Sequence, residues 1–137
     1  MYFFAVRIFI SDRYYNKSLK TKDINEEIYC LEKAKWWNSK NPDYHYSLAL
    51  LYQKKSAHVE IKLYERYKLL FSAKNEFETA ITQSPTQIKY LASYGWLLGN
   101  LGKYDEAIKV LDTAVALNPD LKPATKLKKE FVKLKGR

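Results

Sequence analysis

The chain has 137 residues, of which 47% are hydrophobic and 28% are charged. This composition excludes an intrinsically disordered chain, and the length corresponds to one domain. The formal net charge of +9 raises the question of an acidic partner, such as a peptide, an anionic lipid or a nucleic acid. No stretch sustains the alternation of apolar and polar residues that predicts a β-strand, so we expect helices throughout.

The first segment, roughly residues 2–20, is predicted to be a helix with an apolar first half. Residues 2–10 contain one charged side chain, Arg7. A bilayer span needs about 20 apolar residues, so this stretch alone cannot cross a membrane, and it lacks the basic start and cleavage site of a signal peptide. One interpretation is a first amphipathic helix packed on the rest of the chain. The alternative is the end of a transmembrane helix, and membrane association through residues 2–10 therefore stays open.

A second helix is predicted in DINEEIYCLEKAKWWNSKNP, residues 23–42. Acidic residues near its start stabilise the helix, because they lie at the positive end of the helix dipole. Cys30 lies within the amphipathic pattern, so we predict a small core residue rather than a reactive thiol, and a single cysteine excludes an intramolecular disulfide. Apolar residues at three- and four-residue spacing are Ile24, Ile28, Leu31 and Ala34.

Two further helices with a lengthened connection are predicted in the middle of the chain. They lie in NPDYHYSLALLYQ (41–53) and in FSAKNEFETAITQSP (71–85). The segment 54–66 leads from one to the other, and Tyr64 and Tyr67 continue the helical spacing upstream of Phe77. We therefore expect an overlong second helix rather than a loop.

The stretch 88–119 predicts two helices, and glycine and proline residues indicate where they end. Gly102 lies in the turn between them, and Pro119 closes the second helix because proline cannot continue it. The apolar face of the first helix comprises Ile88, Leu91, Ala92, Gly95, Leu98 and Leu101, and that of the second comprises Tyr104, Ala107, Ile108, Leu111, Ala114 and Val115.

The spacing of the prolines indicates a repeat. Pro85 and Pro119 are 34 residues apart, whereas Pro42 and Pro85 are 43 residues apart, nine more than one period. A helix–turn–helix period of about 34 residues is typical of the tetratricopeptide repeat (TPR), and residues 88–119 resemble a TPR unit. In that resemblance Gly95 occupies the helix-packing position. Tyr52 stands at the matching position of the preceding unit, so we expect the two helices of that unit to splay further apart.

The last segment predicts a capping helix. Residues 120–137 carry seven Lys or Arg against two Asp or Glu, and the lysines lie opposite an apolar face. A stacked array needs such a polar-backed helix to cover its last exposed face. We expect Leu127 and Phe131 above all to cover the helix that contains Leu111 and Val115.

The resemblance implies an all-α fold: a TPR-like superhelical array of about three helix–turn–helix units plus a C-terminal capping helix. We expect a single TPR-like domain, residues 1–137. Its parts are a degenerate unit at 2–42, a lengthened unit at 43–85, a regular TPR unit at 86–119 and the capping helix at 120–135.

No motif in the chain predicts catalysis. A glycine-rich phosphate loop, a serine elbow and a pair of carboxylates with a common target are all missing. His45 and His58 have no cluster around them at metal-ligand spacing, and we expect both at the surface or at a helix edge. We therefore predict that the chain is not an enzyme and binds neither a metal nor a cofactor.

The positive charge alone gives weak support for nucleic-acid binding. The 3 tryptophans, 12 tyrosines and 6 phenylalanines fall mostly at helix-packing spacing, and no nucleic-acid reader motif is present. A solvated lysine face on the last helix explains the basic C-terminus. A basic protein associated with nucleic acid or anionic lipid is the lesser alternative.

The TPR resemblance implies a protein–protein interaction module, an adaptor or scaffold that holds a peptide or partner helix on its concave face. The chaperone-tail binders of the family clamp a terminal carboxylate with Lys, Asn and Arg. Polar groups are missing where that clamp needs them, at Ala49, Ala92 and Trp96, so we expect no chaperone-tail binding. The implied contact residues are Tyr46, Ala49, Gln53, Lys89, Ala92, Trp96 and Asn100.

The order of segments also resembles the C-terminal TPR tails of bacterial O-antigen ligase or polymerase-like membrane proteins. The similarity comprises the apolar first segment, RYYNKSL, the degenerate unit, the lengthened unit and the regular unit. This resemblance implies an extracytoplasmic location on the periplasmic side, whereas a free-standing TPR protein implies the cytoplasm. The identity of the partner, the compartment, the oligomeric state and the role of the lengthening stay open.

Overall fold

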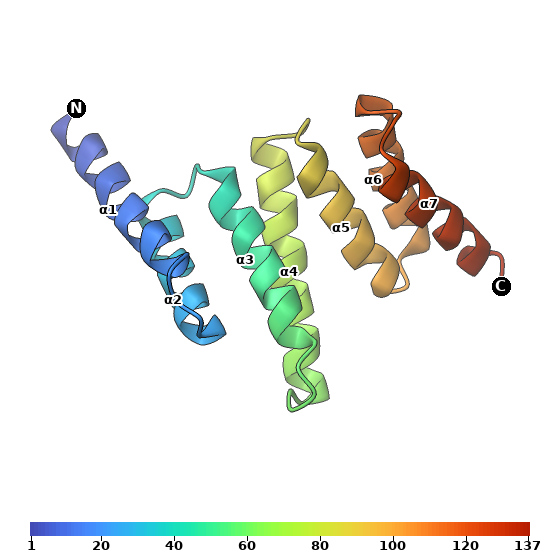
Figure 1. Ribbon diagram of the computed structural model, residues 1–137, viewed down its shortest axis with the longest axis horizontal. Helices are drawn as coiled ribbons and strands as arrows, with labels where there is room; N and C mark the ends of the chain where they lie inside the picture. The colour runs from blue at the N-terminus through green and yellow to red at the C-terminus, as the bar shows by residue number, and fades with distance from the viewer. The chain divides into compact units, whose positions relative to one another are not determined.

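The computed structural model describes residues 1–137, and its regular structure is entirely α-helical (Figure 1). The prediction of an all-α chain is therefore confirmed. The seven helices are α1 (Tyr2–Ser18), α2 (Ile24–Trp37), α3 (Pro42–Ser56), α4 (Leu63–Gln83), α5 (Ile88–Asn100), α6 (Tyr104–Leu117) and α7 (Lys122–Lys135).

Two of the helices, α2 and α3, begin at residues that supply capping side chains. The Asp23 carboxylate accepts a hydrogen bond from the Asn25 amide at 2.9 Å, and the Asn41 side chain accepts one from the Asp43 amide at 3.0 Å. Each bond satisfies an amide that has no partner within its helix. Pro42 occupies the first turn of α3, where its missing N–H costs nothing.

The chain forms two compact units, which we term unit 1 (residues 1–83) and unit 2 (residues 84–137). In unit 1, α1 packs on α2 and α3 packs on α4, with α2 against α3 (Figure 1). In unit 2, α5 and α6 form a hairpin, and α7 packs mainly on α6.

The core of unit 1 is built from small and apolar side chains between the helices. Cys30 and Ala34 of α2, Leu48 of α3 and Phe77 of α4 are all fully buried. Burial raises the pKa of the Cys30 thiol, which keeps it protonated and unreactive. The prediction that Cys30 is a core residue is confirmed.

The lengthening of the second hairpin lies in its second helix, as predicted. Helix α4 has 21 residues, whereas α6 has 14. The first turns of α4 expose Leu63, Tyr64 and Tyr67, and Phe71 is exposed one turn later.

Tyr52 lies on the side of α3 that faces α2. Its ring packs against the buried cluster of Leu31, Leu48 and Leu51, and its hydroxyl donates a hydrogen bond to Glu32 of α2 at 2.5 Å. The large side chain at this position therefore fills space between α2 and α3. The wider separation of α3 and α4 stays a prediction.

The two halves of α1 differ in their contacts. Residues 1–9 are exposed, and the buried residues of the helix are Ser11 and Ser18. The Arg7 Nε donates a hydrogen bond to the Trp37 carbonyl oxygen at 3.1 Å. The helix packs on α2, as the first interpretation expected, but its buried residues lie in its second half. None of the seven helices combines the length and apolar character that a bilayer span requires.

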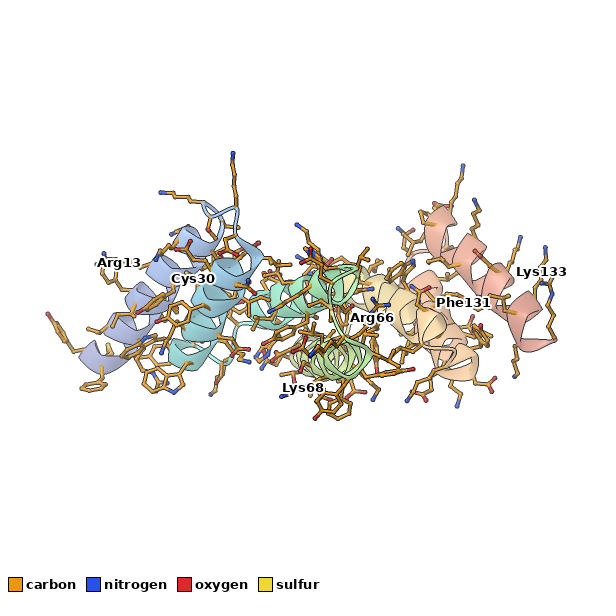
Figure 2. All side chains as sticks on the ribbon, turned by 90° about the horizontal axis from the view of Figure 1, so that it is seen from below. Arg13, Cys30, Arg66, Lys68, Phe131 and Lys133 are labelled. Atoms are coloured by element: carbon orange, nitrogen blue, oxygen red, sulfur yellow. The ribbon has the colours of Figure 1, made fainter.

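Unit 2 depends on two glycines at which α5 approaches its neighbours closely. A Cβ atom at Gly95 would lie 2.7 Å from Leu111 Cγ, and one at Gly99 would overlap the ring of Phe131. Phe131 is 5% exposed, and its ring centroid lies 5.9 Å from that of Tyr104. As expected, α7 covers α6 with its apolar face, while Lys133 extends into solvent (Figure 2).

The turn between α5 and α6 requires the third glycine. Gly102 has a φ of +76°, a left-handed conformation that side chains disfavour. The Lys103 amide donates to the Leu98 carbonyl at 2.9 Å, and the Gly102 amide donates to the Gly99 carbonyl at 3.0 Å. This pair of bonds is a Schellman motif, which ends α5 sharply and starts α6 at a fixed angle.

Gly99→Ala should destabilise unit 2 by roughly 1–3 kcal/mol, because the added methyl group overlaps the Phe131 ring and overpacks the contact. The free energy of unfolding from urea denaturation measures the effect. In a Phe131→Ala background the same change should cost far less, since the overlapping ring is gone.

Gly136→Ala is the matched control, because a Cβ atom there would meet neighbouring atoms only at 3.7 Å. It should leave stability nearly unchanged. If Gly99→Ala cost the same in the wild type and in the Phe131→Ala background, that result would contradict the contact between α5 and the Phe131 ring.

Candidate functional site

One side of α5 presents four of the predicted contact residues, which we term the α5 stripe: Lys89, Ala92, Trp96 and Asn100. Spacings of three and four residues place them on the same side of the helix. Lys89, Trp96 and Asn100 are exposed, and Ala92 is half-buried. The Trp96 side chain retains 46% exposure, although most of its neighbours on α5 are buried.

The opposite side of α5 holds the stripe in place. Leu91, Tyr94 and Leu98 are buried there, and Gly95 faces Leu111 of α6. Because these contacts fix the position and rotation of the helix, Trp96 projects from a rigid element rather than from a loop. Such rigidity lowers the entropy that a side chain loses when it contacts a ligand.

The predicted contact residues of α3 are less accessible. The Tyr46 ring is half-buried, with its centroid 6.1 Å from that of Phe77. Ala49 is fully buried. Gln53 is half-buried, and its Nε2 is a buried donor without a hydrogen-bond partner. Ala49 therefore offers no accessible surface, and the contact role of this group stays a prediction.

A network of charged and polar side chains joins α2, α3 and α4 in unit 1. Glu76 of α4 accepts a hydrogen bond from Lys35 Nζ at 2.7 Å and pairs with His45 Nδ1 at 2.6 Å. Lys35 also donates to Glu32 at 3.0 Å, and the Tyr52 hydroxyl donates to the same carboxylate. His45 is only 6% exposed, so the expectation of a histidine at the surface or at a helix edge is wrong.

The geometry favours the charged form of His45. Its Nδ1 faces the Glu76 carboxylate and its Nε2 faces the Ser39 carbonyl oxygen at 2.9 Å, so both nitrogens must donate. Burial lowers the pKa of His45, but the hydrogen bonds to Glu76 and Ser39 and the charge of Glu76 outweigh burial and raise it. Burial raises the pKa of Glu76, but its bonds with His45 and Lys35 outweigh that effect and lower it.

Sequence reasoning could not find this network. Glu76 lies 31 residues from His45 and 41 residues from Lys35, and no motif spacing connects them. The one local signal was the pair of Glu32 and Lys35 three residues apart. The network can fix the relative position of three helices. No group of three or more His, Cys, Asp or Glu side chains lies together in the chain as a metal site would require.

Comparisons with known proteins agree on the type of fold. Residues 88–121 match the sequence model of the tetratricopeptide repeat. The structure is similar to the Arabidopsis OM64 TPR domain, with a TM-score of 0.75 and 19% identity over 93% of this chain and 98% of that domain. No curated protein has a significant sequence match to the chain.

Two similar structures contain bound peptides. The first TPR of Spaghetti (RPAP3), bound to the HSP90 peptide SRMEEVD, has a TM-score of 0.68 and 19% identity, over 98% of this chain and 94% of that one. The second TPR domain of human RPAP3, in complex with the HSP70 peptide SGPTIEEVD, has a TM-score of 0.69 and 18% identity, over 93% of this chain and 97% of that one. At such identities the likeness establishes the fold alone.

Stability should fall as the pH rises above the ordinary pKa of histidine, about 6.5, because the stabilisation that comes from the raised pKa of His45 is complete below that value and is lost as the pH rises through the raised pKa. His45→Gln should flatten this dependence. Urea denaturation followed by circular dichroism at a series of pH values measures the slope.

His58→Gln is the control, because His58 is exposed and lies outside the network. It should leave the pH dependence as it is in the wild type. The charged network would be refuted if His45→Gln kept the wild-type slope, or if His58→Gln flattened it equally.

Proposed function

Since residues 88–121 are a tetratricopeptide repeat and the whole chain has the fold of TPR domains, we propose that it is a non-enzymatic interaction module whose α5 stripe binds a peptide or partner helix. The fold supports the general role of a protein-binding module. The α5 stripe as the contact surface is our more specific inference.

The exposed Trp96 ring is the observation that carries this proposal. A folded protein normally buries such a side chain, and an indole that stays half-exposed on a rigid helix retains apolar area for a partner to cover. Tryptophan is enriched among the few residues that dominate the binding energy of interfaces. Its indole N–H can also donate a directional hydrogen bond to the partner.

The stripe also indicates the size and chemistry of the ligand. From Lys89 to Asn100 the helix rises by roughly 16 Å, about the length of five extended residues. The Lys89 ammonium, which lies 5.3 Å from the Tyr90 ring centroid, favours a carboxylate or carbonyl near that end. Trp96 favours an apolar side chain, and the Asn100 amide can both donate to and accept from a peptide backbone.

The ligand that this surface favours differs from a chaperone tail. SRMEEVD and SGPTIEEVD are ligands of the similar TPR domains and end in a carboxylate. At the positions where the resemblance places carboxylate-holding groups, this chain has a buried Ala49, a half-buried Ala92 and the Trp96 indole. The two alanines provide no hydrogen-bond donor, so a terminal carboxylate would lose its hydration without compensation.

Trp96→Ala should weaken binding by roughly 30-fold, the loss expected when a central aromatic anchor worth about 2 kcal/mol is removed. Peptides selected from a phage-displayed random library against the wild type supply the ligand, and fluorescence polarisation measures the dissociation constants. Thermal unfolding should change little, because the ring is half-exposed.

Trp36→Ala is the matched control, because Trp36 is an exposed tryptophan of α2 outside the stripe. Its affinity for the same peptides should equal that of the wild type. The proposal fails if no peptide is selected, or if both variants bind alike. It also fails if the fluorescence of Trp96 is protected from a soluble quencher in the free protein, as measured in a variant that lacks Trp36 and Trp37.

A synthetic SRMEEVD peptide should give no saturable binding to this protein in the same assay, because the alanines at the implied clamp positions cannot hold its terminal carboxylate. The same peptide with an amidated C-terminus is the control. Saturable binding of the free acid that disappears on amidation would place the protein among chaperone-tail binders and contradict this expectation.

A further inference from the structure

The first two turns of α1 expose aromatic side chains that make little contact within the protein. Phe3 is 85% exposed and Phe9 is 63% exposed, and Tyr2 and Phe4 are exposed beside them. Single exposed apolar residues are ordinary, but a contiguous group of aromatic rings is costly in water and marks a surface that something else covers.

These aromatic residues surround the helix instead of forming one face. Successive residues turn by about 100° around the axis, so Phe4 and Phe9 lie roughly 100° and 240° from Phe3. A folded partner with one complementary face would cover one of the three rings well. Arg7 is the one charged residue of this segment, and its guanidinium is turned to the Trp37 carbonyl oxygen of α2. A helix end with aromatic rings on several sides fits a medium that surrounds it, such as the apolar part of a lipid layer.

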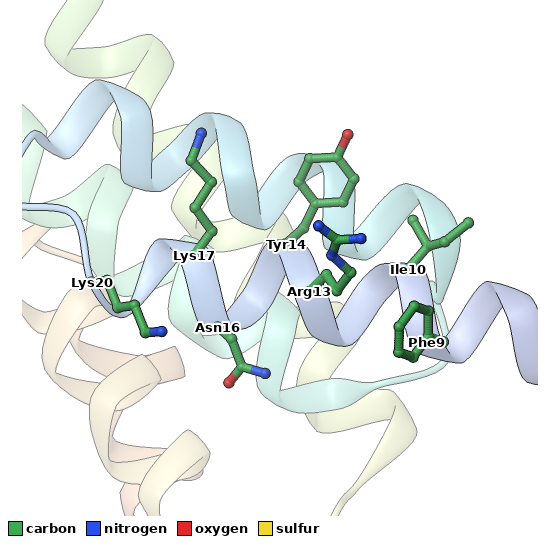
Figure 3. A pocket seen from close by; sticks show the side chains of 7 residues that line it. All are labelled: Phe9, Ile10, Arg13, Tyr14, Asn16, Lys17 and Lys20. Carbon is green, nitrogen blue, oxygen red and sulfur yellow. The ribbon is translucent and has the colours of Figure 1, made fainter.

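Basic side chains follow the aromatic ones along the helix. Phe9, Arg13, Lys17 and Lys20 border a shallow cavity that runs along α1 (Figure 3). Residues 1–22 contain five basic residues and one acidic residue. That acidic residue, Asp12, already accepts a hydrogen bond from the Tyr44 hydroxyl at 3.1 Å.

Some of these cations are not neutralised within the protein. Lys17 pairs with Glu26 at 3.2 Å, but Arg13 and Lys20 have no acidic partner. Basic residues near an anionic lipid surface are attracted to it within about a Debye length. The charge of α1 thus complements a negatively charged bilayer.

The dimensions of the helix match the lipid interface and not the whole bilayer. From Tyr2 to Phe9 the axis rises by roughly 10 Å, the upper end of the roughly 5–10 Å to which interfacial apolar groups are buried. Arg13 follows about 6 Å further along, at the level of lipid phosphates when the first half of the helix is inserted. The eight apolar residues of the segment 2–10 fall far short of the roughly 20 that a span requires.

We propose that the N-terminal half of α1 docks this protein on the surface of an anionic lipid bilayer. Tyr2, Phe3, Phe4 and Phe9 enter the boundary between headgroups and acyl chains, and Arg13 contacts the phosphates. Lys20, about 10 Å further from the inserted end, adds long-range attraction to the anionic surface. This activity is separate from peptide binding on the α5 stripe.

Co-sedimentation with vesicles tests the proposal. The wild type should sediment with phosphatidylcholine vesicles that contain one third phosphatidylglycerol, and far less with pure phosphatidylcholine. Phe3→Ser with Phe9→Ser should lower the partition coefficient by roughly tenfold or more, because two apolar anchors are lost. Arg13→Glu with Lys20→Glu should lower it on the anionic vesicles by a similar factor.

The control is Tyr64→Ser with Phe71→Ser, which removes two aromatic side chains of α4 that are 78% and 64% exposed in the same unit. It should bind vesicles as the wild type does. Circular dichroism and thermal unfolding establish that each variant is folded, and each should bind the peptides selected for the α5 stripe unchanged. Trp96→Ala should bind vesicles normally, so the two proposals can fail separately.

Three results would overturn the docking of α1 on lipid. In the first, the wild type stays in solution in the presence of anionic vesicles. In the second, the α1 and α4 variants lose vesicle binding to the same extent. The third is self-association of the wild type that the Phe3 and Phe9 changes abolish without any vesicle binding, which would identify a second copy as the occupant of this surface.

Discussion

The close approach of α5 to its neighbours is the contact on which the exposed surface of unit 2 depends. Gly95 admits Leu111 and Gly99 admits Phe131 at distances that any side chain would prevent. These contacts fix the rotation of α5 and bury its apolar side. Trp96, on the other side, is left with nothing in unit 2 that must cover it. The same packing that stabilises the unit therefore creates its most distinctive exposed residue.

Unit 1 holds its helices together by different means. Where unit 2 uses glycines, α3 carries Tyr52, which reaches Glu32 of α2, and the charged His45 and Lys35 meet Glu76 of α4. Buried ion pairs cost desolvation energy and add little net stability, but a misplaced helix would leave an unpaired buried charge. The network thus favours one arrangement of three helices over others.

The basic helices at the two ends of the chain show why charge alone does not identify a binding surface. In α7, Lys128 pairs with Asp112 of α6, Lys135 pairs with Asp105, and Phe131 is buried, so the aromatic residue and two of the lysines of that helix already have partners. In α1, aromatic side chains stay exposed and Arg13 has no acidic partner. The lysines of α7 lie beside buried aromatic rings, whereas the cations of α1 lie beside exposed ones, which is the combination from which we propose a lipid-binding surface.

Local pattern in the sequence determined the helices, their ends, the period of 34 residues, the overlong α4 and the burial of Cys30, because each depends on residues within a few turns of one another. The residues of the α5 stripe were also predicted from the sequence, and their role in binding stays a prediction. Only the tertiary structure decided that Ala49 and His45 are buried, that Phe131 fills the space at Gly99, and that the first half of α1 has almost no cover. Whether these residues are buried or paired depends on other helices that are distant in the sequence. The spacing of residues along one helix does not show which other helix packs against it.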